Sequence, residues 1–199
     1  MSTSTARVPY HHGGLPDALV AGALELLHEG GVAALSLRAA ARRAGVSATA
    51  PYRHFADKEA LLAAVATHGF SLLAARLARA DADAESADAA LVAQGVAYVQ
   101  FACDDPALFR LMFGRDQSEA HPGLREAGDR AYAVLAQRVA GMTDATTRED
   151  LTLAAWSLVH GLASLLVDGQ LGEAVPDPAG LARRISSLLL RIRHRPSAE

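Results

Sequence analysis

Cysteine is almost missing from the sequence: Cys103 is the single one in 199 residues. One thiol excludes an internal disulfide framework and leaves no partner for a cysteine-based metal site. Long runs of β-branched residues are rare, whereas alanine-rich segments occur throughout, and this favours helices over strands. Hydrophobic residues make up 51% and charged residues 21% of the chain, as in folded globular proteins. The sequence therefore predicts an all-α protein.

The motifs of common enzyme classes are also missing. We find no nucleophile elbow, phosphate-binding glycine loop, HExxH zinc motif or dinucleotide-binding glycine pattern. The adjacent histidines His11 and His12 cannot form a closed metal site alone, and the other histidines lack metal-ligand spacing. We therefore expect that the protein is not an enzyme and binds no metal or cofactor. The alternative interpretations are an all-helical enzyme and a helical adaptor protein.

Signals for export and membrane insertion are weak. The N-terminal stretch MSTSTARVPYHH lacks the apolar core of a signal peptide. One apolar run, Leu151–Val167, lies between Asp150 and Asp168, contains His160 and falls short of the roughly 20 residues that a span needs. These features predict a cytoplasmic protein with no membrane partner, and a buried helix at this run.

Basic residues are concentrated in one window, although the chain as a whole carries a net charge of −3. Residues 36–58 hold five basic side chains against Asp57 alone, which gives this window +4 and leaves −7 for the rest. Such a patch on an otherwise acidic protein favours a local contact with nucleic acid.

Apolar periodicity and helix-capping residues predict the helices. The first is expected at 15–29, ended by Gly30 and Gly31. The second is expected at 37–44 with Ser36 as its cap and with Arg38, Arg42 and Arg43 on its outer face. A long helix follows Asp57, and further helices are expected at 87–103, 106–113, 123–140, 147–168 and 178–193. The acidic run at 81–88 is interpreted as a solvated linker between two functional units.

Residues 36–58 also have the pattern of a helix-turn-helix, with a short helix, a turn containing Gly45 and a second helix. Pro51 stands within this second helix. If the helix begins at Thr49 or Ala50, the proline lies in the first turn, where amide hydrogens have no helical partner. We therefore predict a very short second helix that starts there.

Two segments resemble a known family. LELLHEGGVAALSLRAAARRAGVSATAPYRHFADKEALLAAV (24–65) is similar to the DNA-binding domain of TetR/AcrR transcriptional regulators. WSLVHG (156–161) resembles the subgroup with a WHG-type C-terminal domain. The resemblance implies an N-terminal three-helix DNA-binding domain (1–57) and a C-terminal helical effector-binding and dimerisation domain (58–199). It also implies a homodimeric repressor of palindromic operator DNA, released by a small-molecule effector.

The resemblance assigns DNA contacts to the basic window. Tyr52, His54 and Lys58 would hold phosphates, and Arg53 would reach a base edge, phosphate or solvent. Arg7 would act as a basic arm. The full set of DNA-binding candidates is Ser36, Arg38, Ser47, Ala48, Thr49, Ala50, Tyr52, Arg53, His54 and Lys58.

Two further sets of residues are expected in the C-terminal domain. Aromatic and thioether side chains would line an effector cavity or simply fill the core, and they suit an apolar or aromatic effector: Tyr98, Phe101, Phe109, Met112, Phe113, Tyr132, Trp156 and His160. Apolar stripes on the last two helices would pair with a second copy or complete the monomer core: Leu158, Gly161, Leu162, Leu165, Leu181, Ile185, Leu188, Leu189 and Ile192.

Overall fold

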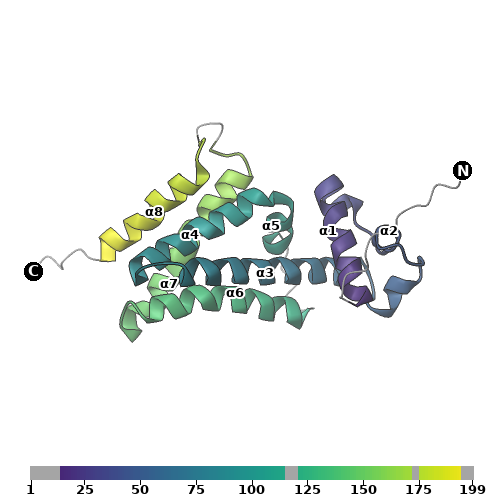
Figure 1. The fold of residues 1–199 in the computed structure, drawn as a ribbon, viewed down its shortest axis with the longest axis horizontal. Coiled ribbons are helices and arrows are strands. Elements are labelled where there is room, and N and C mark those ends of the chain that lie inside the picture. The colour runs from purple at the N-terminus through teal and green to yellow at the C-terminus, as the bar shows by residue number, and fades with distance from the viewer. Residues whose placement is uncertain (1–13, 115–120, 172–174, 194–199) are drawn as a thin grey trace, which may run out of the picture. The chain divides into compact units, whose positions relative to one another are not determined.

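A computed structural model describes residues 14–114, 121–171 and 175–193 of the chain. Within these ranges all regular structure is helical, as the sequence predicted (Figure 1). Arg7, His11 and His12 lie outside the described residues. The elements are α1 (Leu15–Ala34), α2 (Leu37–Arg43), η1 (Ala50–Arg53), α3 (Lys58–Ala82), α4 (Ala87–Asp104), α5 (Pro106–Phe113), α6 (Pro122–Ala140), α7 (Ala145–Val167) and α8 (Pro178–Arg193). The chain divides into two compact units, and the boundary lies inside α3, between Val65 and Ala66.

In the N-terminal unit, α2 packs against α1 over a core of leucine and alanine side chains. The helical backbone of α1 is interrupted at Gly30 and Gly31, and Gly31 has a φ of 66°. The predicted stop of the first helix is therefore present as a kink, after which helical turns continue to Ala34. The predicted cap of α2 is confirmed, because the Ala39 amide donates to Ser36 Oγ at 3.1 Å.

The turn and second helix of the helix-turn-helix follow α2. Gly45 has a φ of 69°, and the next amide, of Val46, donates to the Ala41 carbonyl at 3.0 Å. The second helix begins at Ala50, so Pro51 lies in its first turn as predicted. It is a single turn of 3-10 helix, held by amides of His54 and Phe55 that both donate to the Pro51 carbonyl at 2.9 Å.

Gly45→Ala is expected to destabilise the protein by about 1–2 kcal/mol, the cost of a left-handed conformation for a residue with a Cβ. No atom within 4 Å would touch the new Cβ, so the loss comes from backbone strain alone. The matched control is Gly141→Ala at the end of α6, where φ is −80° and alanine fits without strain. Urea unfolding followed by circular dichroism measures both, and equal losses would contradict the prediction.

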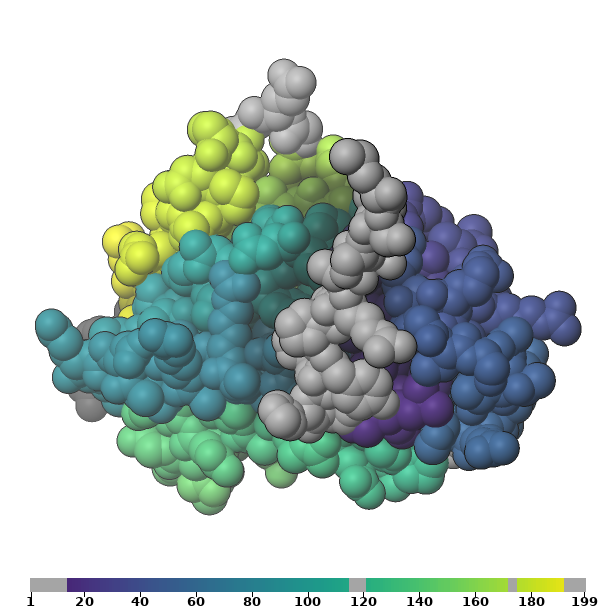
Figure 2. Space-filling view, turned by 45° about the vertical axis from the view of Figure 1, so that its right-hand side comes forward, coloured from purple at the N-terminus to yellow at the C-terminus, as the bar shows by residue number. Residues whose placement is uncertain are grey.

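In the C-terminal unit, α4 is the central helix. It packs against α8, α7, α6 and α5, and most of its residues are buried. Figure 2 shows α8, in yellow, along one side of this unit beside the teal helices. The helices match the predicted ranges to within two residues at each end from 87 onwards. Their caps explain this: Asp105 Oδ1 accepts from the Leu108 amide at 3.0 Å, and Pro106 begins α5.

The acidic run at 81–88 is only in part the solvated linker between two units that we predicted. Residues 83–86 connect α3 to α4 and are mostly exposed, but the boundary between the two units lies inside α3, and Asp81 is not solvated. Asp81 lies in the last turn of α3, half-buried, and forms a two-pronged ion pair with Arg138 of α6, whose Nε lies 2.6 Å from Asp81 Oδ1. Gln94 Nε2 of α4 donates to the same oxygen at 2.6 Å. The prediction was wrong for Asp81 because its partners are 13 and 57 positions away, beyond the reach of local charge patterning. The ion pair with Arg138 and the hydrogen bond from Gln94 together join α3, α6 and α4 in the C-terminal unit.

Candidate functional site

The predicted DNA-binding residues form an exposed surface on α2, the turn and η1. Tyr52 is 53% exposed, which is unusual for an aromatic side chain within a folded unit. Half-buried positions are confined to Ala50 and Lys58. The exposed members are Ser36, Arg38, Ser47, Ala48, Thr49, Tyr52, Arg53 and His54. This surface therefore presents hydroxyl, imidazole, phenol and guanidinium groups to solvent, all of which can donate to phosphate oxygens.

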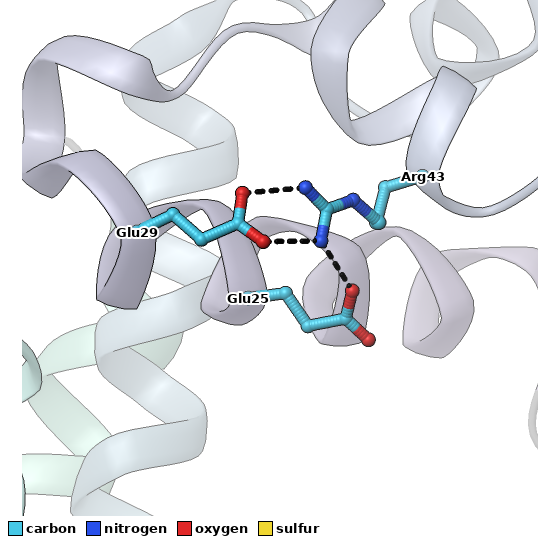
Figure 3. Close-up of polar contacts among 3 residues, drawn as sticks. All are labelled: Glu25, Glu29 and Arg43. Atoms are coloured by element: carbon cyan, nitrogen blue, oxygen red, sulfur yellow. Dashed lines mark hydrogen bonds and ion pairs between the residues drawn. The ribbon is translucent and has the colours of Figure 1, made fainter.

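One arginine of the basic window is not available to a partner. Arg43 donates to Glu29 of α1 through both terminal nitrogens, at 2.7 and 2.6 Å, and to Glu25 at 2.9 Å (Figure 3). The hydrogen bonds that Arg43 donates to Glu29 and then to Glu25 raise the pKa of Arg43, and the hydrogen bond that Glu29 accepts from Arg43 lowers the pKa of Glu29. The sequence suggested that Arg43 stood free on the outer face of α2. Instead it ties α2 to α1, and the free positive charge of this surface is smaller than the window implied.

Lys58 is also bonded within the unit. Its Nζ donates to the Val32 carbonyl at 2.8 Å and so connects the start of α3 to the last turns of α1. An ammonium group carries three N–H donors, so two remain for a phosphate. The structure thus gives Lys58 a structural contact beside the phosphate contact that the family resemblance implies.

A cavity of about 580 Å³ lies within the C-terminal unit. Five of the eight predicted residues line it: Tyr98, Met112, Phe113, Tyr132 and Trp156. Phe101 and Phe109 are buried and His160 is half-buried, but none of these three lines the cavity. Leu189, which we assigned to the dimer face, does line it. Lining residues that the sequence analysis missed include Phe70, Leu73, Leu77, Gln94, Arg125 and Ser186.

His160 lies behind the cavity wall. Its Nδ1 is 2.8 Å from the Tyr98 hydroxyl, and the rings of Phe109, Phe113 and Trp156 surround it. Burial lowers the pKa of His160, and burial raises the pKa of Tyr98 against a smaller opposing effect of a hydrogen bond from Trp156. Both side chains are therefore neutral near pH 7, and the phenol can donate to the imidazole.

The melting temperature of the wild type is expected to fall more steeply between pH 7 and pH 5 than that of His160→Gln. The folded protein holds His160 with a lowered pKa, so the unfolded chain takes up this proton first as the pH falls through about 6.5. The stability contributed by neutral His160 is present above that pH and is lost below it. His68→Gln, at an exposed position of α3, is the control and should leave the slope unchanged. Identical slopes for all three proteins would contradict the assignment.

An apolar face of α7 and α8 is left uncovered within the chain. Leu153 and Leu165 of α7 are 53% and 39% exposed, and Leu188 of α8 is 48% exposed. No atom within 4 Å would touch a Cβ added at Gly161. Of the other predicted interface residues, Leu162 is buried, Leu158, Leu181 and Ile185 are half-buried, and the Ile192 side chain lies outside the described residues.

Helices α3 and α7 are both long and apolar enough to span a membrane by length and composition alone, a test that core helices of soluble proteins also pass. Only 28% of the apolar window of α7 is buried within the chain, against 44% for α3. A smaller share of the apolar window of α7 is thus buried within the single chain, which leaves more of that window open to another partner.

Comparison with known proteins finds a family match in each of the two units. Residues 19–65 match the model of bacterial regulatory proteins of the tetR family, and residues 91–189 match that of the tetracyclin repressor-like C-terminal domain. Among curated proteins no relative matches.

Several solved structures share the fold. A protein with unknown function from Rhodococcus sp. RHA1 is 38% identical over 93% of this chain and 98% of that one, with a TM-score of 0.79. A bacterial regulatory protein in the tetR family from Rhodococcus RHA1 is 23% identical over 90% and 97%, with a TM-score of 0.66. The transcriptional regulator FadR from Bacillus subtilis, in complex with stearoyl-CoA, is 14% identical over 87% and 96%, with a TM-score of 0.70.

The two matched ranges include the exposed helix-turn-helix and most of the residues that line the cavity, and they confirm the resemblance that the sequence showed. The chain has an N-terminal DNA-binding domain with a helix-turn-helix and a C-terminal helical ligand-binding domain, and it belongs to the TetR family of bacterial transcriptional regulators.

Proposed function

We propose that the protein is a cytoplasmic repressor that binds palindromic operator DNA as a homodimer and is released by a small-molecule effector. Residues 1–57 serve as the DNA-binding domain, and residues 58–199 bind the effector and the second copy. The observation that carries the proposal is the exposed surface of α2, the turn and η1, where the aromatic ring of Tyr52 and the guanidinium of Arg53 are open to solvent.

In this proposal η1 enters the major groove. Tyr52, His54 and Lys58 contact phosphates and fix its position, while Arg53 and Thr49 reach base edges, where an arginine favours guanine. Each subunit reads one half-site, and two half-sites on one face of DNA lie about 34–36 Å apart, one helical turn. The apolar face of α7 and α8 pairs the two copies in a four-helix interface.

The effector occupies the cavity of the C-terminal unit. A mainly apolar lining with few polar groups suits a small organic molecule, and about 580 Å³ falls in the range of ligand pockets. The FadR regulator of the same fold holds stearoyl-CoA, a ligand with a long apolar chain. Effector binding releases DNA to the extent that the effector prefers the conformation that does not fit the operator.

Selection of bound duplexes from a random pool tests the proposal. We expect the selected duplexes to share an inverted repeat. Sedimentation and gel-shift experiments should show that one dimer binds each duplex, with an affinity that falls steeply as the salt concentration rises. Failure to retain any duplex at low salt would favour a protein-binding adaptor instead.

Lys58→Ala separates the two contacts of this lysine. If Lys58 binds phosphate, the slope of log affinity against log salt should decrease by about 0.9 for each of the two lysines in a dimer. If it only joins α3 to α1, the variant should melt at a lower temperature while the slope stays unchanged. Arg79→Ala, an exposed arginine of the C-terminal unit, is the control for loss of a positive charge.

A further inference from the structure

Two buried polar atoms of residues that line the cavity have no hydrogen-bond partner among the described residues of the protein. They are Gln94 Oε1 on α4 and Ser186 Oγ on α8, and no other buried side-chain nitrogen or oxygen in the described ranges lacks one. Both residues line the cavity, and each is 2% exposed. Native proteins rarely leave such atoms unpaired, because each loses its hydrogen bonds to water without compensation. Because two such atoms belong to residues of one apolar cavity, they indicate that a bound ligand supplies their missing hydrogen-bond partner.

The orientation of the Gln94 amide is fixed by its neighbour. Its Nε2 donates to Asp81 Oδ1 at 2.6 Å, and a carboxylate can only accept there. The hydrogen bonds from Arg138 and then Gln94 lower the pKa of Asp81, so that this carboxyl stays ionised. The amide nitrogen is thereby occupied, and the unpaired atom Oε1 is an acceptor. A ligand atom that pairs with it must donate a hydrogen.

The Ser186 hydroxyl forms no hydrogen bond within the described part of the protein. A serine in a helix commonly donates to the carbonyl four residues earlier, as Ser187 does to Arg183 at 2.7 Å. Ser186 makes no such bond. Its Oγ lies where a Cβ at position 95 would collide with it, so Gly95, next to Gln94 on α4, provides the space for this hydroxyl. The hydroxyl can both donate and accept.

The remaining lining defines what cannot bind there favourably. Two charged residues line the cavity, Arg125 and Asp129; both are exposed and have opposite signs. Among the described residues, Arg138 is already paired with Asp81, so it is not a free cation beside Gln94. A carboxylate at this position would face the Gln94 acceptor without a balancing charge, at a high desolvation cost. A hydroxyl instead fits both unpaired atoms, since it donates one hydrogen and accepts another.

We propose that the effector is a neutral, largely apolar alcohol or phenol whose hydroxyl donates to Gln94 Oε1 and accepts from the Ser186 hydroxyl. This inference rests on the proposed function, because it names the ligand class of the same cavity. The apolar body of the ligand lies against the leucine and aromatic side chains, among them Leu73, Leu77 and Trp156. The chemistry of one polar pair thus selects alcohols over acids of equal length.

Trp156 provides the measurement, because it is the only tryptophan of the chain and lines the cavity. Its fluorescence is titrated with three probes: 1-decanol, 1-methoxynonane, which has the same heavy-atom count but no donor, and decanoate. We expect 1-decanol to bind about 5- to 10-fold more tightly than 1-methoxynonane, the value of one net hydrogen bond, and decanoate to bind most weakly.

Ser186→Ala is expected to weaken the binding of 1-decanol about 5- to 10-fold, while Ser187→Ala, at a half-buried serine of α8 that does not line the cavity, leaves binding unchanged. Ser186→Ala should melt no lower than the wild type, because it removes a buried hydroxyl without a partner. Gln94→Met should remove the preference for 1-decanol over 1-methoxynonane. A lower melting temperature for Ser186→Ala would show that the hydroxyl is paired within the protein and would overturn the proposal.

Three binding results would also overturn it: decanoate or 1-methoxynonane binding as tightly as 1-decanol, none of the probes binding, or Ser186→Ala binding 1-decanol like the wild type. Release of operator DNA is measured separately by gel shift. Selective binding of 1-decanol without release of DNA would support the ligand class and contradict the proposed effector-controlled release. Release by decanoate but not by 1-decanol would contradict the ligand class alone.

Discussion

Operator affinity falls at least about 100-fold when Tyr52, Arg53 and Lys58 are all replaced by alanine. Each contact to DNA contributes about 0.5 kcal/mol or more, and a homodimer loses each of the three contacts twice, so the loss is about 3 kcal/mol or more. Tyr52 and Arg53 are exposed, so the loss of their side chains removes little packing from the free protein. A gel-shift titration against the selected operator at fixed salt measures the change.

The control for this variant replaces Arg79 and Arg130 by alanine. It therefore removes two positive charges per subunit, as many as the triple variant removes. Both arginines lie in the C-terminal unit, where they form only loose surface pairs at 3.7 and 4.0 Å, and such pairs contribute little stability. If the control loses as much affinity as the triple variant, net charge alone explains binding. An unchanged affinity of the triple variant would refute the assignment of η1 to the groove.

Local signals in the sequence were enough to predict the helices and the position of Pro51. Ser36, Asp57 and Asp105 each accept a backbone amide three residues ahead, so the cap lies beside the helix start that it specifies. Gly45 permits the left-handed backbone of the turn, and Pro51 fixes φ at its own position. Features of this kind need no knowledge of the tertiary structure.

The polar contacts inside the units depend on residues far apart in the sequence, and these could not be predicted. Arg43 was expected to stand in solvent, but Glu29, 14 positions away, binds it. Asp81 and Arg138 are 57 positions apart. The unpaired atoms of Gln94 and Ser186 show only once α4 and α8 are packed together, because a polar residue on a helix is otherwise assigned to the solvent face. The aromatic and thioether residues predicted the cavity only in part, because five of the eight line it.

Leu165→Glu combined with Leu188→Glu is expected to convert a dimer into a folded monomer. Both leucines are exposed in the single chain, so the new carboxylates cost the monomer little. In a twofold-symmetric interface each charge is buried twice without a partner, at several kcal/mol per charge, and the dissociation constant should rise by more than about 1000-fold. Sedimentation measures the association, and operator binding should weaken with it. Leu72→Glu, a 46% exposed leucine of α3, is the matched control and should remain dimeric.

Gly161→Ala distinguishes an interface residue from a structural one. A glycine within a helix costs about 1 kcal/mol relative to alanine, and the added methyl group would touch nothing in the single chain, so the monomer should become more stable. If the α7 backbones of two copies approach each other at Gly161, the same methyl group separates them, and the dimer should weaken. Opposite changes in monomer stability and in dimer affinity cannot come from a residue that serves the monomer alone. A variant that gains stability and keeps its dimer affinity would remove Gly161 from the interface.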